Sequence, residues 1–166
     1  MKTKNNILLA EKMNLSRFDT LTSKIIWAVD LEKTITGITR IDHLIFVTLY
    51  KKWGIGQYTS LLKFDTGEIL WTIKKVFTSI LITDQYVFSL KGSMLEALSL
   101  KTGKEHFSIS TTFTWTAPTL ALIRETLYLY SKKKVLEVNQ KNGQLMEVES
   151  PKGLDIQSIT ILVDEF

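Results

Sequence analysis

Short apolar runs alternate with short polar turns along nearly the whole chain. The runs are about 5–8 residues long and are rich in Ile, Leu, Val, Thr, Phe and Tyr, the residue types that favour strands. Clear examples are residues 44–49, 79–83, 86–90, 120–123 and 126–130. No stretch of about 12 residues carries a capped 3.6-residue apolar period. The pattern therefore predicts an all-β protein.

Four similar segments recur at separations of about 40 residues, the length of a four-stranded propeller blade. Each segment has the pattern of a strand, a tight turn and a second strand, and the four span residues 17–27, 63–71, 97–107 and 137–147. A small residue closes each turn: Ser23, Gly67, Gly103 and Gly143. Four places later stand Trp27, Trp71, Phe107 and, in the last copy, Glu147. We expect the three aromatic residues to be buried where one blade packs against the next.

A second pair of strands precedes the repeated segment in the last three copies, within residues 37–50, 79–90 and 119–130. Each copy then forms a meander of four antiparallel strands. The chain is therefore expected to fold as a four-bladed propeller-type array, a single domain over residues 1–166.

The repeated pattern Ala-x-Asp-x-x-Thr-Gly-x-x-x-Trp resembles the repeat of PQQ-like (quinoprotein-type) β-propellers. The matching residues, copy by copy, are Asp19, Thr22 and Trp27; Asp65, Thr66, Gly67 and Trp71; Ala97, Thr102 and Gly103; and Gly143. This alignment deletes two residues before the threonine of the second copy. The resemblance implies a propeller in which the Asp, Gly and Trp are structural, with the Trp docking blade against blade. None of the family's cofactor ligands can be matched in this chain.

The two ends of the chain are complementary. The first copy lacks its first strand, because Ile7 begins directly at the second, whereas residues 158–166 resemble a first strand. The preferred closure is a four-bladed ring in which residues 158–164 pair near residues 7–10 and complete the first blade. The alternative is that two chains together form an eight-bladed ring.

Residues that carry chemistry are few. The chain has no cysteine, which excludes disulfides, thiol catalysis and thiolate metal sites. Its only histidines, His43 and His106, are expected to be ordinary turn and strand residues. No calcium loop and no Gly-rich phosphate loop is present. We therefore expect no catalytic residue, no metal and no cofactor, and interpret the chain as not an enzyme.

Charge and hydropathy restrict the partners further. The net charge is +4, and the lysines are spread along the chain rather than gathered into the basic stripe of a nucleic-acid binder. No apolar run reaches the length of a signal peptide's core or of a membrane helix. We expect a cytoplasmic protein that contacts neither nucleic acid nor membrane.

One long connection is a candidate binding site. Residues 50–58 lengthen the loop between the second and third strands of the second copy and contain three aromatic residues and two lysines. Aromatic loops on rigid β scaffolds often bind partners; the alternative is that the loop folds back on its own aromatic residues. The candidate partner-binding residues, with one from the 111–118 connection, are Lys51, Lys52, Trp53, Tyr58 and Trp115.

These features together favour a non-enzymatic module that binds another protein, as a monomer or homodimer. The most concrete hypothesis is an immunity or inhibitor protein that neutralises a bacterial toxin, with a nuclease as one candidate. The alternatives are a propeller scaffold protein of an assembly complex, and a hydrolase or lyase with a site at the propeller mouth.

Overall fold

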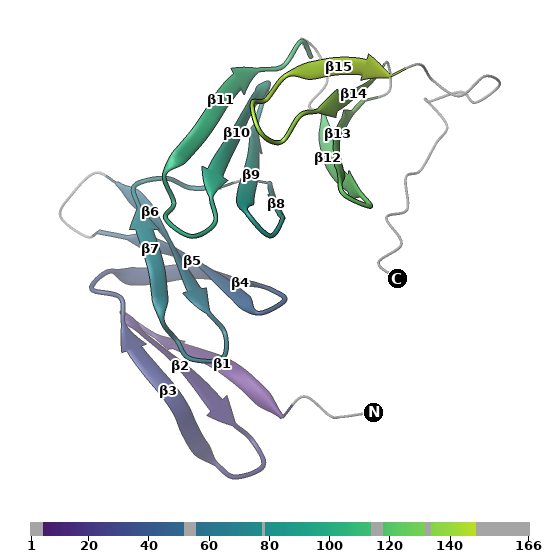
Figure 1. Ribbon diagram of the computed structural model, residues 1–166. Helices are drawn as coiled ribbons and strands as arrows, with labels where there is room; N and C mark the ends of the chain where they lie inside the picture. The colour runs from purple at the N-terminus through teal and green to yellow at the C-terminus, as the bar shows by residue number, and fades with distance from the viewer. Residues whose placement is uncertain (1–4, 52–55, 78, 114–117, 132–133, 149–166) are drawn as a thin grey trace. The chain divides into compact units, whose positions relative to one another are not determined.

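A computed structural model describes residues 5–51, 56–77, 79–113, 118–131 and 134–148, and all of their regular structure is strand (Figure 1). The strands are β1 (Asn6–Glu11), β2 (Asn14–Asp19), β3 (Lys24–Asp30), β4 (Thr34–Ile41), β5 (Leu44–Tyr50), β6 (Gln57–Lys63), β7 (Ile69–Ile73), β8 (Ile80–Ile82), β9 (Tyr86–Lys91), β10 (Met94–Ser99), β11 (Glu105–Ser110), β12 (Thr119–Ile123), β13 (Thr126–Tyr130), β14 (Val135–Val138) and β15 (Leu145–Val148). In this part of the chain no helix is long and apolar enough to cross a membrane.

The strands form four antiparallel meanders in which neighbours in sequence pair with one another. Blade 1 is β1–β3, blade 2 is β4–β7, blade 3 is β8–β11 and blade 4 is β12–β15. The all-β, propeller-type prediction is thereby confirmed. Among the described residues blade 1 consists of three strands, which agrees with the expected missing strand, and residues 158–164, which are predicted to complete it, lie outside them.

The chain divides into two compact units, Met1–Val76 with blades 1 and 2 and Phe77–Phe166 with blades 3 and 4. In the first unit, Leu15 of β2 packs against Ile45, Val47 and Leu49 of β5 and Leu62 of β6. These positions are two apart along β5 because alternate residues of a strand face one side of the sheet. Blades 1 and 2 therefore pack face to face over an apolar core.

The second unit repeats this arrangement. Phe88 of β9 and Leu95 of β10 pack in one cluster with Leu127 and Leu129 of β13 and Leu136 of β14. Burying side chains of this size contributes about 1.5–3 kcal/mol each. Each pair of blades thus has a core of its own.

The turn between the last two strands is the same in blades 2, 3 and 4. The amides of Gly67, Gly103 and Gly143 donate to the carbonyls four residues earlier at 2.8–2.9 Å, and each glycine has a positive φ. Ser23 has the same conformation in blade 1, with φ 53°. The equal spacing shows that the second copy has no deletion. Lys63, not Asp65, holds the place of Asp19, and the sequence alignment was wrong at this point.

A β-bulge precedes the aromatic residue in the first three blades. The ladder between the last two strands shifts by one residue, so that Ile26, Leu70 and His106 are left out of the pairing. Trp27, Trp71 and Phe107 consequently pair with Arg17, Leu61 and Ala97. A bulge of this kind re-aims the side chain that follows it.

Blade 4 has no such shift between β14 and β15. The residue paired with Glu137, at the place of Arg17 in blade 1, is therefore Met146 and not Glu147. The expectation that Glu147 replaces the tryptophan fails because the spacing of four residues after the glycine holds only where the bulge adds a residue.

Candidate binding surface

Trp27 joins blade 1 to the turn of blade 2. A Cβ placed on Gly67 would lie 2.7 Å from two carbons of the Trp27 ring, so the indole rests directly on the glycine. Its Nε1 donates to the Phe64 carbonyl at 2.9 Å. The ring is half-buried, whereas Trp71 is 7% exposed. These contacts assign Trp27 a structural role, as the resemblance implied.

Phe107 makes the corresponding contact in the second unit. A Cβ on Gly143 would lie 2.8 Å from the Phe107 ring. The neighbouring His106 donates from Nε2 to the Lys141 carbonyl at 2.7 Å and stacks on Tyr86 with 4.8 Å between ring centroids. His106 is therefore part of the packing of blade 3 against blade 4, as its position in a strand suggested.

The predicted binding loop is only partly within the described residues. Lys52 and Trp53 lie outside them, as does Trp115. Lys51 is exposed, and Tyr50, the last residue of β5, is 44% exposed. Tyr58 differs from expectation, because it belongs to β6, pairs with Leu49 and packs against the core of the first unit. It is held by the fold rather than displayed on a loop.

Lys33 and Lys74, from the connections after β3 and β7, lie near Tyr58, and Lys51 follows Tyr50 in the chain. The Lys33 Nζ lies 5.0 Å from the centroid of the Tyr58 ring, a cation–π distance. The Lys74 side chain passes over Gly56, where a Cβ would lie 2.9 Å from its Cε. We call Lys33, Lys51 and Lys74 with Tyr50 and Tyr58 the lysine rim.

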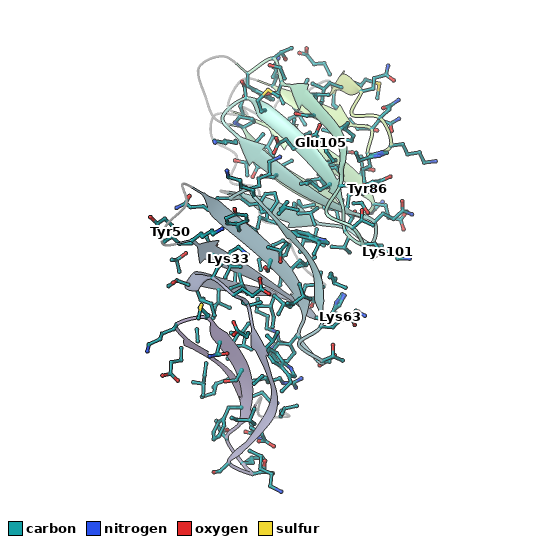
Figure 2. The ribbon with its side chains drawn as sticks, turned by 90° about the vertical axis from the view of Figure 1, so that its left-hand side faces the viewer. Lys33, Tyr50, Lys63, Tyr86, Lys101 and Glu105 are labelled. Atoms are coloured by element: carbon teal, nitrogen blue, oxygen red, sulfur yellow. The ribbon has the colours of Figure 1, made fainter. Side chains whose placement is uncertain are left out.

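The lysine rim lies at one end of blade 2. Figure 2 shows Lys33 and Tyr50 together at that end and Lys63 at the other. Sequence reasoning missed Lys33 and Lys74, since they follow β3 and β7 and lie some distance along the chain from the loop. The strand order alone could have indicated them. In an antiparallel meander the chain enters the first strand, and leaves the second and fourth strands, at the same end of the blade, and Lys33, Lys51 and Lys74 stand at these three places in blade 2.

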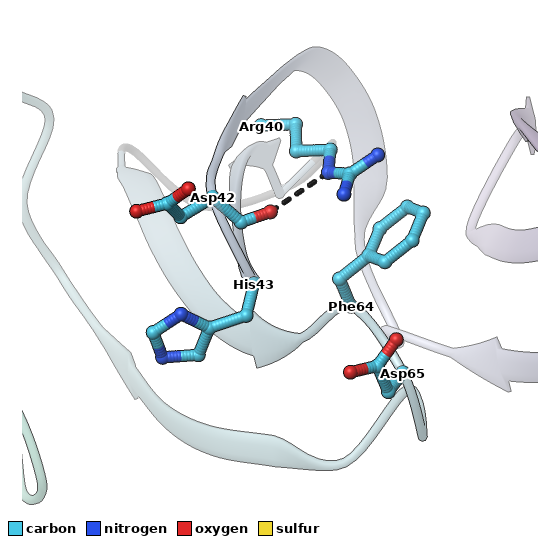
Figure 3. Close-up of a pocket in the computed structure, with 5 residues that line it drawn as sticks. All are labelled: Arg40, Asp42, His43, Phe64 and Asp65. Atoms are coloured by element: carbon cyan, nitrogen blue, oxygen red, sulfur yellow. Dashed lines mark hydrogen bonds between the residues drawn. The ribbon is translucent and has the colours of Figure 1, made fainter. Parts of the chain in front are cut away.

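The opposite end of blade 2 holds a pocket of about 450 Å³ (Figure 3), lined by Arg40, Asp42, His43, Phe64 and Asp65. The Phe64 ring is stacked by two guanidinium groups, with the Cζ of Arg17 4.1 Å and that of Arg40 3.4 Å from its centroid. Arg17 also donates to the Phe64 carbonyl and to Asp65, each at 3.2 Å. Arg17, from β2, therefore packs blade 1 onto blade 2, whereas Arg40, from β4, packs within blade 2.

This pocket does not assemble an acid–base pair from its lining residues. Arg40 Nε donates to the Asp42 main-chain carbonyl at 2.8 Å, and the His43 ring points away from Phe64 and Asp65 (Figure 3). Within the described residues, His43 is hydrogen-bonded to neither Asp42 nor Asp65, whereas a general base needs a partner within hydrogen-bond reach. The residues that the structure describes contain no group of three side chains that could hold a metal ion.

Comparison with known proteins supports the fold. No family model and no curated protein matches the sequence. Among solved structures, BamB from Moraxella catarrhalis aligns over 87% of this chain and 49% of its own length, at 14% identity and TM-score 0.52. KlHsv2 with a replaced loop 6CD aligns over 92% and 52%, at 17% identity and TM-score 0.55.

Kluyveromyces lactis Hsv2p gives a similar result, covering 87% of this chain and 48% of its own, at 15% identity and TM-score 0.53. The chain thus spans about half the length of the structures that it matches. Since BamB and Hsv2 are β-propellers, the likeness identifies the architecture of this chain as β-propeller-like.

Proposed function

We propose that this chain is a non-enzymatic protein-binding module. More specifically, we infer an inhibitor that neutralises a bacterial toxin by direct binding, as immunity proteins do. The observation that carries the proposal is the lysine rim, where an exposed tyrosine, Tyr50, stands beside Lys51 at the same blade end as Lys33 and Lys74. Aromatic anchors supply much of the affinity at protein interfaces, and charged neighbours steer the encounter.

The charge of the rim indicates the kind of surface that it fits. Three lysines close to two tyrosines select an acidic patch on the partner. The groove with which a nuclease holds phosphates is basic, because it must neutralise the nucleic-acid backbone. If the toxin is a nuclease, this chain therefore binds an acidic surface beside the catalytic groove rather than the groove itself.

The test uses the full chain, immobilised, to capture a partner from a lysate of the source cell. The captured protein is identified and purified for binding measurements. We expect Tyr50→Ala to weaken its binding by about 1–2 kcal/mol. Lys51→Glu should weaken binding at low salt and have less effect at high salt. Lys101→Glu, an exposed lysine in a turn of the second unit, is the matched control.

Co-expression of the captured protein with this chain separates an inhibitor from a general scaffold. An inhibitor restores growth of cells that express the partner, and the Tyr50→Ala chain restores it less well. Binding that is unchanged in both rim variants would exclude the lysine rim as the interface. A partner that is not toxic would exclude the immunity role while leaving protein binding in place.

A further inference from the structure

Two neighbouring residues of the second unit, Asn142 and Gly143, form the sequence at which asparagine deamidates most readily. In that reaction the main-chain nitrogen of the next residue attacks the side-chain amide carbon of the asparagine. Glycine permits the attack best, because it has no Cβ to crowd the approaching atoms. No other asparagine of this chain precedes a glycine. Asn142 is also exposed to the water that the reaction consumes.

The folded turn holds both reacting groups in place. The Gly143 amide, whose nitrogen would attack, donates to the Asn139 carbonyl at 2.8 Å. The Asn142 side chain accepts at Oδ1 from the Gln144 amide at 2.9 Å. Ring closure requires the Gly143 nitrogen to give up its hydrogen bond and to approach the Cγ of Asn142. The turn must therefore open locally before the two groups can react.

Two side chains of blade 3 keep this turn closed. The Phe107 ring lies on Gly143, where an added Cβ would be 2.8 Å from it, and His106 Nε2 donates to the Lys141 carbonyl at 2.7 Å. Gly143 is buried although Asn142 is exposed. Rotation of the peptide between these two residues would drive the glycine against the ring. The packing of blade 3 on blade 4 thus opposes the opening that deamidation needs.

We propose that Asn142 is a site of spontaneous deamidation and that the contact between Phe107 and Gly143 sets its rate. In the first step a bond forms between the Gly143 nitrogen and the Asn142 Cγ, and the bond from Cγ to Nδ2 breaks. Ammonia leaves with the proton that the Gly143 amide has lost. Water then opens the cyclic imide: cleavage at Cγ gives aspartate, and cleavage at the main-chain carbonyl carbon gives isoaspartate.

The isoaspartate product undoes the contact that protected its precursor. Its main chain runs through Cβ and Cγ, which adds a methylene group between positions 142 and 143. The hydrogen bond from Gly143 to Asn139 and the place of Gly143 beneath Phe107 then no longer fit one backbone geometry. Deamidation should therefore loosen blade 4 from blade 3, and any other change that loosens these blades should speed deamidation.

The test incubates the full chain at mildly alkaline pH and follows Asn142 by mass spectrometry of its peptides. The folded parent should react at least about tenfold more slowly than the parent unfolded in urea, which corresponds to about 1.4 kcal/mol of local opening. Phe107→Leu, which removes the ring but keeps an apolar side chain, should raise the folded rate by about three- to tenfold. Trp27→Leu makes the corresponding change in the first unit, and this matched control should leave the rate at Asn142 unchanged.

Asn142→Thr separates the chemical change from other effects of incubation. Thr66 and Thr102 hold this place in blades 2 and 3 and accept from the amide two residues later at 3.2 and 3.4 Å, so the variant is expected to fold. After incubation the parent should lose hydrogen-exchange protection in β12–β15, whereas Asn142→Thr should keep it.

Three results would overturn the proposal. The first is an equal rate of deamidation in the folded and the unfolded parent, and the second is an equal rate in Phe107→Leu and Trp27→Leu. The third is full hydrogen-exchange protection of β12–β15 in chains that carry isoaspartate. Because Asn142 lies in the second unit and the lysine rim in the first, these results leave the proposed partner binding to its own test.

Discussion

The two units join their blades with the same geometry but distribute the chemistry differently. In the first unit Trp27 supplies both the ring on Gly67 and the hydrogen bond to the Phe64 carbonyl. In the second unit Phe107 supplies the ring on Gly143, and His106, the bulge residue beside it, donates to the Lys141 carbonyl. In both units an aromatic ring lies on a turn glycine and a side chain of the preceding blade donates to the turn; in the second unit two adjacent residues share these tasks.

The bulge makes this sharing possible. A regular strand sends neighbouring side chains to opposite faces, whereas a bulge turns one residue out of the ladder and re-aims it. His106 uses that freedom to reach the turn of blade 4. Its counterpart in blade 1, Ile26, lies half in solvent and has no polar side-chain atom, so the donors to the turn are instead the indole nitrogen of Trp27 and the guanidinium group of Arg17.

The largest loss of stability is expected when a methyl group is added to a turn glycine that contacts the aromatic ring of the preceding blade. Gly67→Ala and Gly143→Ala should each destabilise their unit by about 2–4 kcal/mol, through overpacking against the ring and through strain at positive φ. Gly92→Ala is the matched control, since Gly92 has φ 60° with open space around its Cβ position. It should cost only about 1 kcal/mol of backbone strain.

Urea unfolding of the full chain measures these changes. Trp27, Trp53 and Trp71 all belong to Met1–Val76, so tryptophan fluorescence reports mainly on the first unit. Hydrogen exchange of β12–β15 reports on the second. If Gly67→Ala is no more harmful than Gly92→Ala, the ring does not hold the two blades together.

A smaller effect should separate the ring from the hydrogen bond. Trp27→Phe keeps an aromatic ring on Gly67 and removes the indole donor, so it should cost about 1 kcal/mol. In the second unit the same loss should follow from His106→Phe and not from Phe107→Tyr, whose ring is retained. If Trp27→Phe and the parent unfold at the same urea concentration, the hydrogen bond from Arg17 at 3.2 Å is enough to satisfy the Phe64 carbonyl without the indole.

The sequence could predict the repeated architecture because alternation and turn glycines act locally. Strand bounds such as Thr126–Tyr130 agree with the apolar runs, and the turn glycines have the expected left-handed backbone. The blade 4 residue at the place of Trp27 could not be predicted, because the bulge that adds one residue in the other blades is absent between β14 and β15 and the place falls to Met146 instead of Glu147. Lys33 and Lys74 were missed for a related reason: only the pairing of the strands brings them close to Tyr58.

Replacing the one non-glycine turn residue should stabilise the chain. Ser23 holds φ 53° in the turn where the other blades have glycine. An L-residue in this conformation is strained by roughly 1 kcal/mol, so Ser23→Gly should raise the free energy of unfolding by somewhat less than that. An unchanged or lower midpoint in urea would indicate that the Ser23 side chain makes a stabilising contact in the folded protein.

The smallest effect concerns acid stability and distinguishes the turn of blade 1 from the others. The Leu21 amide and then the Thr22 hydroxyl donate to the Asp19 carboxylate and lower its pKa below the usual value of 3.8. Because the folded pKa lies below the unfolded one, this contribution to stability is full above the unfolded value and is lost as the pH falls through the folded value. Ser99 and Asn139, which hold the same place in blades 3 and 4, have no such dependence because their side chains do not titrate in this range.

Asp19→Asn keeps an acceptor for the Leu21 amide, so the parent should lose slightly more stability than this variant between pH 5 and pH 3. Parallel acid profiles for the two proteins would show that the hydrogen bonds to Asp19 do not discriminate between its charged and neutral forms.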